Sequence, residues 1–131
     1  MAKILVIDDD GAMRTVLGLM LKRAGHDATL YANGRLAMTS IDQGQAFDLV
    51  VTDILMPEMD GIEVITALRS RGSAPLILAI SGADSPPSVD LLKAATNLGA
   101  QGALQKPFTD EVFIGLVEDL LRRYATASAT S

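Results

Sequence analysis

The sequence predicts an α/β protein, a doubly wound sheet of five parallel strands in which each strand is followed by a helix. Short runs rich in leucine and β-branched residues alternate with longer segments whose apolar residues recur at helical spacing. This alternation is typical of parallel strands joined by crossover helices. The 131 residues, 49% of them hydrophobic, suit one packed domain, and we expect no second domain within this length.

The five strands are expected in the short apolar runs. The first run, Lys3–Ile7, has four consecutive apolar residues, which is typical of a strand buried on both faces of a sheet. The remaining strands are expected at residues 28–31, 47–52, 76–80 and 102–105.

The helices are expected at residues 11–24, 34–42, 61–71, 85–98 and 109–124. Asn33 precedes the second helix, and Thr109 or Asp110 caps the fifth. Pro86 and Pro87 fit the first turn of the fourth helix, where a missing N–H costs little. We expect the domain to span residues 1–124 and the uncharged, non-periodic tail 125–131 to be disordered.

The composition narrows the classes of partner. Lys and Arg total 11 against 16 acidic residues, giving a net charge of -5 without a basic run, so we expect no nucleic-acid partner. The chain has no Cys, which excludes disulfides and thiolate metal sites. The first apolar run is too short for a signal peptide or a membrane span, so we expect a cytoplasmic protein without membrane contact.

Polar residues stand at or just after the ends of four of the predicted strands. In doubly wound sheets, ligands bind beyond the carboxyl ends of the strands, where the strand order changes direction. The residues that we expect to converge there are Asp8, Asp9, Asp53, Ser81 and Lys106. Asp10 is assigned instead to a helix N-cap, a common role for aspartate directly before a helix.

These residue types suit a magnesium-dependent phosphoryl transfer. Converging carboxylates repel one another and call for a cation, and Mg²⁺ prefers oxygen ligands. A carboxylate such as Asp53 can act as a nucleophile and form an aspartyl-phosphate. The Lys106 charge, the Ser81 hydroxyl and Mg²⁺ would then each take one phosphoryl oxygen. Singly, Ser81 also suits a Ser-Gly turn and Lys106 a solvated loop, so the combination carries this interpretation.

Three segments resemble the receiver domain of two-component response regulators, and the likeness extends to about Tyr124. They are Ile4–Asp10 (ILVIDDD), Asp53–Gly61 (DILMPEMDG) and Lys106-Pro107-Phe108. Their order and spacing on successive strand-helix units make the resemblance specific, and it is to the single-domain, chemotaxis-regulator-like kind. It implies a flavodoxin-like (βα)5 fold with strand order 2-1-3-4-5.

The resemblance also implies the role of each site residue. Asp53 would be the phosphoacceptor, and Asp9 and Asp53 would bind Mg²⁺ directly, with Asp8 acting through water. The backbone carbonyl of Leu55 would be a further metal ligand, and Ser81 and Lys106 would contact the phosphoryl group.

The resemblance implies two protein partners. The phosphoryl donor would be a phosphohistidine on a histidine kinase or a histidine phosphotransfer protein, and a downstream protein would read the face formed by the fourth helix, the fifth strand and the fifth helix. The domain would catalyse only its own phosphorylation and dephosphorylation in the phosphorelay. The single His26 matches no donor and is expected to be structural.

One departure from the family pattern concerns signal transmission. Receivers usually carry an aromatic residue three positions before the lysine, and Ala103 stands there in this sequence. Coupling is then expected to rely on the loop after Ser81 and on repacking of the fourth helix.

Two alternatives remain open at the level of the sequence. A magnesium-dependent phosphatase with an aspartyl nucleophile usually needs a second acid two residues further on, where this chain has Leu55. A degenerate receiver would keep the fold and bind partners without phosphorylation, a possibility that Ala103 supports.

Overall fold

The computed structural model describes residues 2–54, 61–71, 75–82 and 88–129. Its strands are β1 (Lys3–Ile7), β2 (Asp27–Tyr31), β3 (Leu49–Asp53), β4 (Leu76–Ser81) and β5 (Gly102–Gln105). Its helices are α1 (Gly11–Arg23), α2 (Gly34–Asp42), α3 (Gly61–Ser70), α4 (Ser88–Leu98) and α5 (Asp110–Ala129). The strands form one parallel sheet in the order β2-β1-β3-β4-β5, which confirms the predicted fold class.

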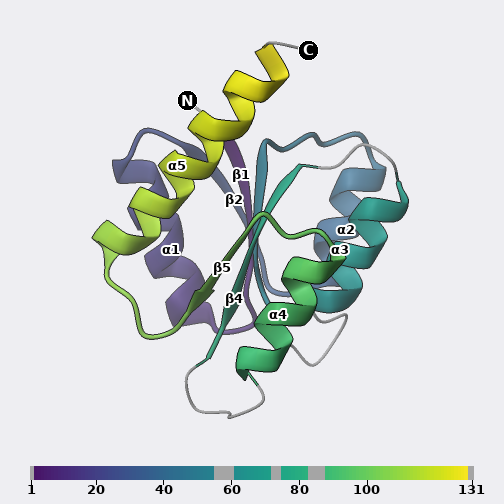
Figure 1. Cartoon of the computed structure of the whole chain (residues 1–131), viewed down its shortest axis with the longest axis horizontal. Helices are drawn as coiled ribbons and strands as arrows, with labels where there is room; N and C mark the ends of the chain where they lie inside the picture. Colours follow the sequence, from purple (N-terminus) through teal and green to yellow (C-terminus); the bar gives the residue numbers. More distant parts are fainter. Residues whose placement is uncertain (1, 55–60, 72–74, 83–87, 130–131) are drawn as a thin grey trace.

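The sheet separates two layers of helices (Figure 1). Helices α1 and α5 cover one face, and α2, α3 and α4 cover the other. Because successive strand residues point to opposite faces, each strand contributes alternately to two cores. The core under α1 and α5 includes Val6, Val51 and Phe113. The core under α2, α3 and α4 includes Val50 and Ala79.

Side-chain caps start the helices where the sequence predicts them. The Asp10 carboxylate accepts hydrogen bonds from the N–H groups of Ala12 and Met13, at 3.0 and 3.3 Å, so its assignment as an N-cap is confirmed. The Asn33 side chain accepts from the Leu36 N–H at 2.9 Å at the start of α2. Each cap satisfies an N–H that has no partner within its helix.

Some element boundaries differ from the prediction. Strand β3 begins at Leu49, not at Phe47, because Leu49 pairs with Ile4 and a residue two positions earlier would face the chain before β1. Helix α5 continues to Ala129, past the expected end of the domain at Tyr124, over a stretch containing alanine, the best helix former. The expected start of the fourth helix at 85–87 lies outside the described residues.

Across the described ranges, none of the helices combines the length and the apolar character that crossing a membrane requires.

Candidate functional site

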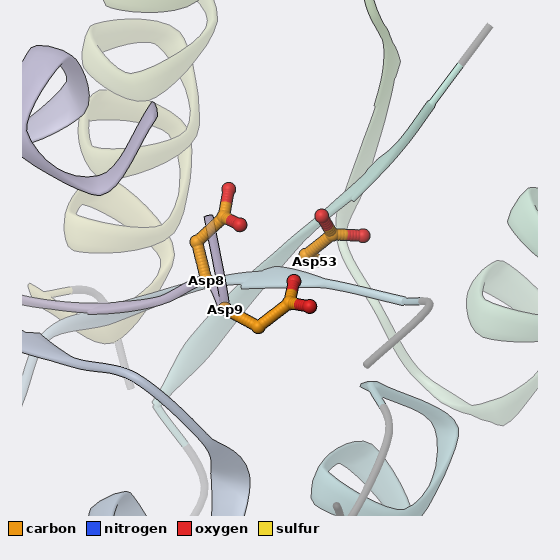
Figure 2. A group of neighbouring side chains, drawn as sticks. All are labelled: Asp8, Asp9 and Asp53. Atoms are coloured by element: carbon orange, nitrogen blue, oxygen red, sulfur yellow. The ribbon is translucent and has the colours of Figure 1, made fainter. Parts of the chain in front are cut away.

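Three carboxylates meet at the carboxyl edge of the sheet. Asp8 and Asp9 directly follow β1, and Asp53 is the last residue of the neighbouring β3 (Figure 2). One carboxylate oxygen from each residue lies within 4.8 Å of the others. Asp8 and Asp53 are buried while Asp9 is exposed, so solvent reaches the cluster from the Asp9 side.

Lys106, the residue directly after β5, lies against this cluster. Its Nζ lies 3.1 Å from Asp53 Oδ2 and 3.4 Å from Asp8 Oδ2. The Lys106 N–H donates to the Ser81 carbonyl at 2.8 Å, which ties the chain after β5 to the end of β4, and the Lys106-Pro107 peptide is cis. The structure thus brings Asp8, Asp53 and Lys106 together.

Burial and pairing shift two pKa values in the cluster. Burial raises the pKa of Asp8, and the Asp53 charge adds to this, while the Asp10 N–H and Lys106 only partly counteract it. Burial alone would lower the pKa of Lys106, but attraction to Asp53 and Asp8 outweighs it and the pKa is raised. Lys106 therefore stays charged, and any further positive charge at the cluster would oppose the rise in the pKa of Asp8.

The Ser81 hydroxyl is buried at the end of β4. It has no hydrogen-bond partner among the described residues. Asp53 pairs with Ile80, so Ser81 lies one position further along the neighbouring strand. By alternation Ser81 belongs to the face of Ile77 and the α4 layer, whereas Asp53 belongs to the α1 and α5 face. A buried hydroxyl without a partner is costly, so the Ser81 hydroxyl is free to donate to a ligand oxygen at this edge of the sheet.

Two further residues shape the Asp53 end of β3, and sequence reasoning assigned no role to either. The Thr52 hydroxyl donates to the Asp53 carbonyl at 3.0 Å. Gly61, the first residue of α3, leaves no room for a side chain, since a Cβ there would lie 2.6 Å from the same carbonyl oxygen. A glycine opening a helix soon after a strand is the sequence signal that points to such a close approach.

The remaining predicted residues have these positions. Leu55 lies outside the described residues, so its carbonyl stays a prediction. Ala103 is exposed on β5 and pairs with Ala79. The His26 side chain is largely buried; its Nδ1 accepts from the Ala2 N–H at 3.2 Å and its Nε2 lies 2.8 Å from Glu118 Oε1. These contacts join the N-terminal segment to α5 and bear out a structural role.

The donor set fits a hydrated magnesium ion. Three carboxylates offer hard oxygen ligands, and Mg²⁺ is usually held by one or two carboxylates and several waters. The exposed Asp9 gives a hydrated ion a way in.

Comparison with known proteins identifies the family. The family model of the response regulator receiver domain matches residues 4–118. The chain is 34% identical over 126 residues to the transcriptional regulatory protein FixJ of Bradyrhizobium diazoefficiens, covering 95% of this chain and 59% of FixJ. It is 39% identical over 121 residues to the response regulator MprA of Mycolicibacterium vanbaalenii, covering 92% of this chain and 51% of MprA.

Solved receiver structures share the fold. The Francisella response regulator 1452 receiver domain superposes with a TM-score of 0.84 at 27% identity, covering 95% of this chain and 99% of that one. The Vibrio cholerae chemotaxis protein CheY4 gives a TM-score of 0.80 at 29% identity, covering 91% and 98%.

The chain belongs to the response regulator receiver domain family of two-component systems. It is therefore a signalling domain and not a classical enzyme, which disfavours the phosphatase alternative. The chain spans about half the length of the curated relatives that it matches, and several of these are transcriptional regulators.

Proposed function

We propose that Asp53 accepts a phosphoryl group in a magnesium-dependent phosphorelay step. The observation that carries this proposal is the cluster of three carboxylates within 4.8 Å, with Lys106 Nζ 3.1 Å from Asp53 Oδ2. This is the charge arrangement that phosphoryl transfer needs, because the reaction depends on positioning and on neutralising phosphoryl oxygens.

In the proposed step, an Asp53 carboxylate oxygen attacks the phosphorus of a phosphohistidine. A P–O bond forms as the P–N bond breaks, and the imidazole nitrogen keeps the electron pair and takes up a proton from solvent. The product is an aspartyl-phosphate on this chain and a free histidine on the partner. Asp53 is largely buried, which limits access by water to the product.

Asp8, Asp9 and Asp53 would hold Mg²⁺, with the carbonyl of Leu55 as a further predicted ligand. The ion would supply positive charge to the phosphoryl oxygens. Lys106 would neutralise a second oxygen, moving little from its present contact with Asp53. The Ser81 hydroxyl would donate to a third, which would give this buried group a partner.

The donor in this proposal is a histidine kinase or a histidine phosphotransfer protein, acting in the cytoplasm. The signal would be read by a downstream protein on the face of α4, β5 and α5. The net charge of -5 favours a protein over nucleic acid as the direct partner of this chain. Because Ala103 replaces the usual aromatic residue, coupling would proceed through the segment after Ser81 and through α4.

Acetyl phosphate provides a direct test. The chain is incubated with acetyl phosphate and Mg²⁺, and its intact mass is measured. We expect the mass of one phosphoryl group to be added, and expect this gain to disappear in Asp53→Asn and in the presence of EDTA. Absence of any gain in the wild-type chain would contradict the proposal and favour a degenerate receiver. A gain that persists in Asp53→Asn would place the phosphoryl group elsewhere.

A further inference from the structure

Almost every polar atom of Asp8 has a hydrogen-bond or ion-pair partner. Its N–H donates to the Tyr31 carbonyl at 3.2 Å, and its Oδ1 accepts from the Asp10 N–H at 2.9 Å. Its Oδ2 faces Lys106 at 3.4 Å. Its carbonyl lies beyond Ile7, the last residue of β1 that pairs with either neighbouring strand. A donor for that carbonyl must therefore come from outside the sheet.

Arg14 supplies that donor. Its Nη1 lies 2.8 Å from the Asp8 carbonyl oxygen. The half-buried side chain reaches back from the first turns of α1, and Arg14 Nη2 lies 3.6 Å from where a Cβ of Gly11 would be. Within the described residues the guanidinium forms no ion pair with a carboxylate. Its hydrogen bond to the backbone is therefore its defining contact.

The Arg14 hydrogen bond also affects the position of Asp9. The Asp8 carbonyl and the Asp9 N–H belong to one planar peptide unit, so anchoring the carbonyl also fixes the Asp9 Cα. The Asp9 carboxylate is exposed and has no hydrogen bond of its own among the described residues. Without the Arg14 contact, the Asp8-Asp9 peptide would lose the hydrogen bond to its carbonyl, and the Asp9 carboxylate would be held less firmly toward Asp8 and Asp53.

We infer that Arg14 is a positioning residue for the metal site, which sets the Asp8-Asp9 peptide so that Asp9 is preorganised to bind Mg²⁺. The inference rests on the proposed function. Residues that orient metal ligands without touching the ion commonly contribute strongly to metal affinity.

Two substitutions separate positioning from charge. Arg14→Gln removes the positive charge, and a purely electrostatic role predicts tighter Mg²⁺ binding because less repulsion opposes the ion. Arg14→Lys keeps the charge but loses the planar fork, and an electrostatic role predicts unchanged binding. Positioning predicts weaker binding in both variants. Arg23→Gln, an exposed arginine in the last turn of α1, is the matched control.

The measurement is calorimetric titration of the unphosphorylated chain with MgCl₂ alone, after thermal unfolding has shown each variant to be folded. We expect both Arg14 variants to bind Mg²⁺ about 10-fold more weakly, and Arg23→Gln to bind like the wild type. Saturating Mg²⁺ should then restore phosphorylation by acetyl phosphate. Wild-type or tighter affinity in either Arg14 variant would overturn the inference, even if the wild type is phosphorylated. A wild type that binds no Mg²⁺ would overturn the inference together with the metal part of the proposed function.

Discussion

Gly61 lies directly against the carbonyl oxygen of Asp53. A Cβ at Gly61 would be 2.6 Å from that oxygen and 2.7 Å from Ile54 Cα, while the Gly61 N–H donates to the Ile54 carbonyl at 2.9 Å. The first turn of α3 and the end of β3 therefore touch backbone to backbone. The position of Asp53 depends on a residue without a side chain.

Gly61→Ala should therefore displace the end of β3. Both crowded atoms belong to the backbone and cannot rotate away, so we expect a loss of about 1 to 3 kcal/mol in the free energy of unfolding. Phosphorylation by acetyl phosphate should slow as well, because Asp53, the proposed phosphoacceptor, moves. Urea denaturation and intact mass measure the two effects.

Gly115→Ala is the matched control. Gly115 lies within α5, and a Cβ there meets nothing within 4 Å. Alanine should stabilise the chain by about 0.5 to 1 kcal/mol, because glycine is unfavourable inside a helix. Equal destabilisation by both substitutions would show that the contact at Asp53 has no special cost.

Ser81→Ala should stabilise the unphosphorylated chain. The hydroxyl is buried without a partner among the described residues, so its removal should raise the free energy of unfolding by about 1 kcal/mol. The same change should weaken binding of beryllofluoride, a phosphoryl mimic. Thr52→Val removes a buried hydroxyl that does have a partner, the Asp53 carbonyl, and should be destabilising. A loss of stability in Ser81→Ala would mean that the hydroxyl is satisfied.

How far the sequence predicts this molecule depends on the kind of information required. The alternation of apolar runs fixes the order of strands and helices, and parallel topology then brings Asp8, Asp53 and Lys106 to one edge. The sequence alone places the start of β3 two residues too early, because pairing with β1 decides where the strand begins. The Arg14 contact escaped prediction because a side chain reaching back six residues to a backbone carbonyl leaves no periodic pattern.

His26 should contribute to stability through its two contacts. Because Nδ1 accepts from the Ala2 N–H, the ring proton is on Nε2 and is donated to Glu118. His26→Ala would leave the Ala2 N–H without its partner, and we expect the free energy of unfolding, measured by urea denaturation, to fall by about 1 to 3 kcal/mol. Glu118→Gln keeps an acceptor on a partly exposed residue and should cost less than about 1 kcal/mol. Wild-type stability in His26→Ala would contradict a structural role for the ring.

The pair between Asp42 and Arg71 should make stability depend on pH in acid. Arg71 Nε and Nη2 lie 2.8 and 3.0 Å from the two Asp42 oxygens, and the hydrogen bond from Arg71 lowers the pKa of Asp42. A lowered folded-state pKa means that the unfolded chain binds more protons. The contribution of the pair to stability is therefore fully present above the ordinary aspartate pKa of 3.8 and is lost as pH falls through the lower folded-state pKa.

Asp42→Asn tests this pH dependence. The variant should unfold at a lower temperature than the wild type near neutral pH, and the difference should vanish in acid below the folded-state pKa of Asp42. Asp27→Asn, another exposed acid, serves as the control for a general loss of negative charge. A difference between Asp42→Asn and the wild type that stays constant down to acid would exclude the ion pair as its source.

Asp53 and Ser81 belong to opposite faces of the sheet, each backed by its own core. A phosphoryl group bonded to Asp53 that also accepts a hydrogen bond from the Ser81 hydroxyl would link the two layers of helices. Local unfolding of one layer of helices would then be coupled to local unfolding of the other. After phosphorylation, amide hydrogen exchange should therefore slow in α1 and α5 as well as in α4. In this receiver, phosphorylation would then act as a change in cooperativity across the sheet, without requiring an aromatic ring at position 103 to move.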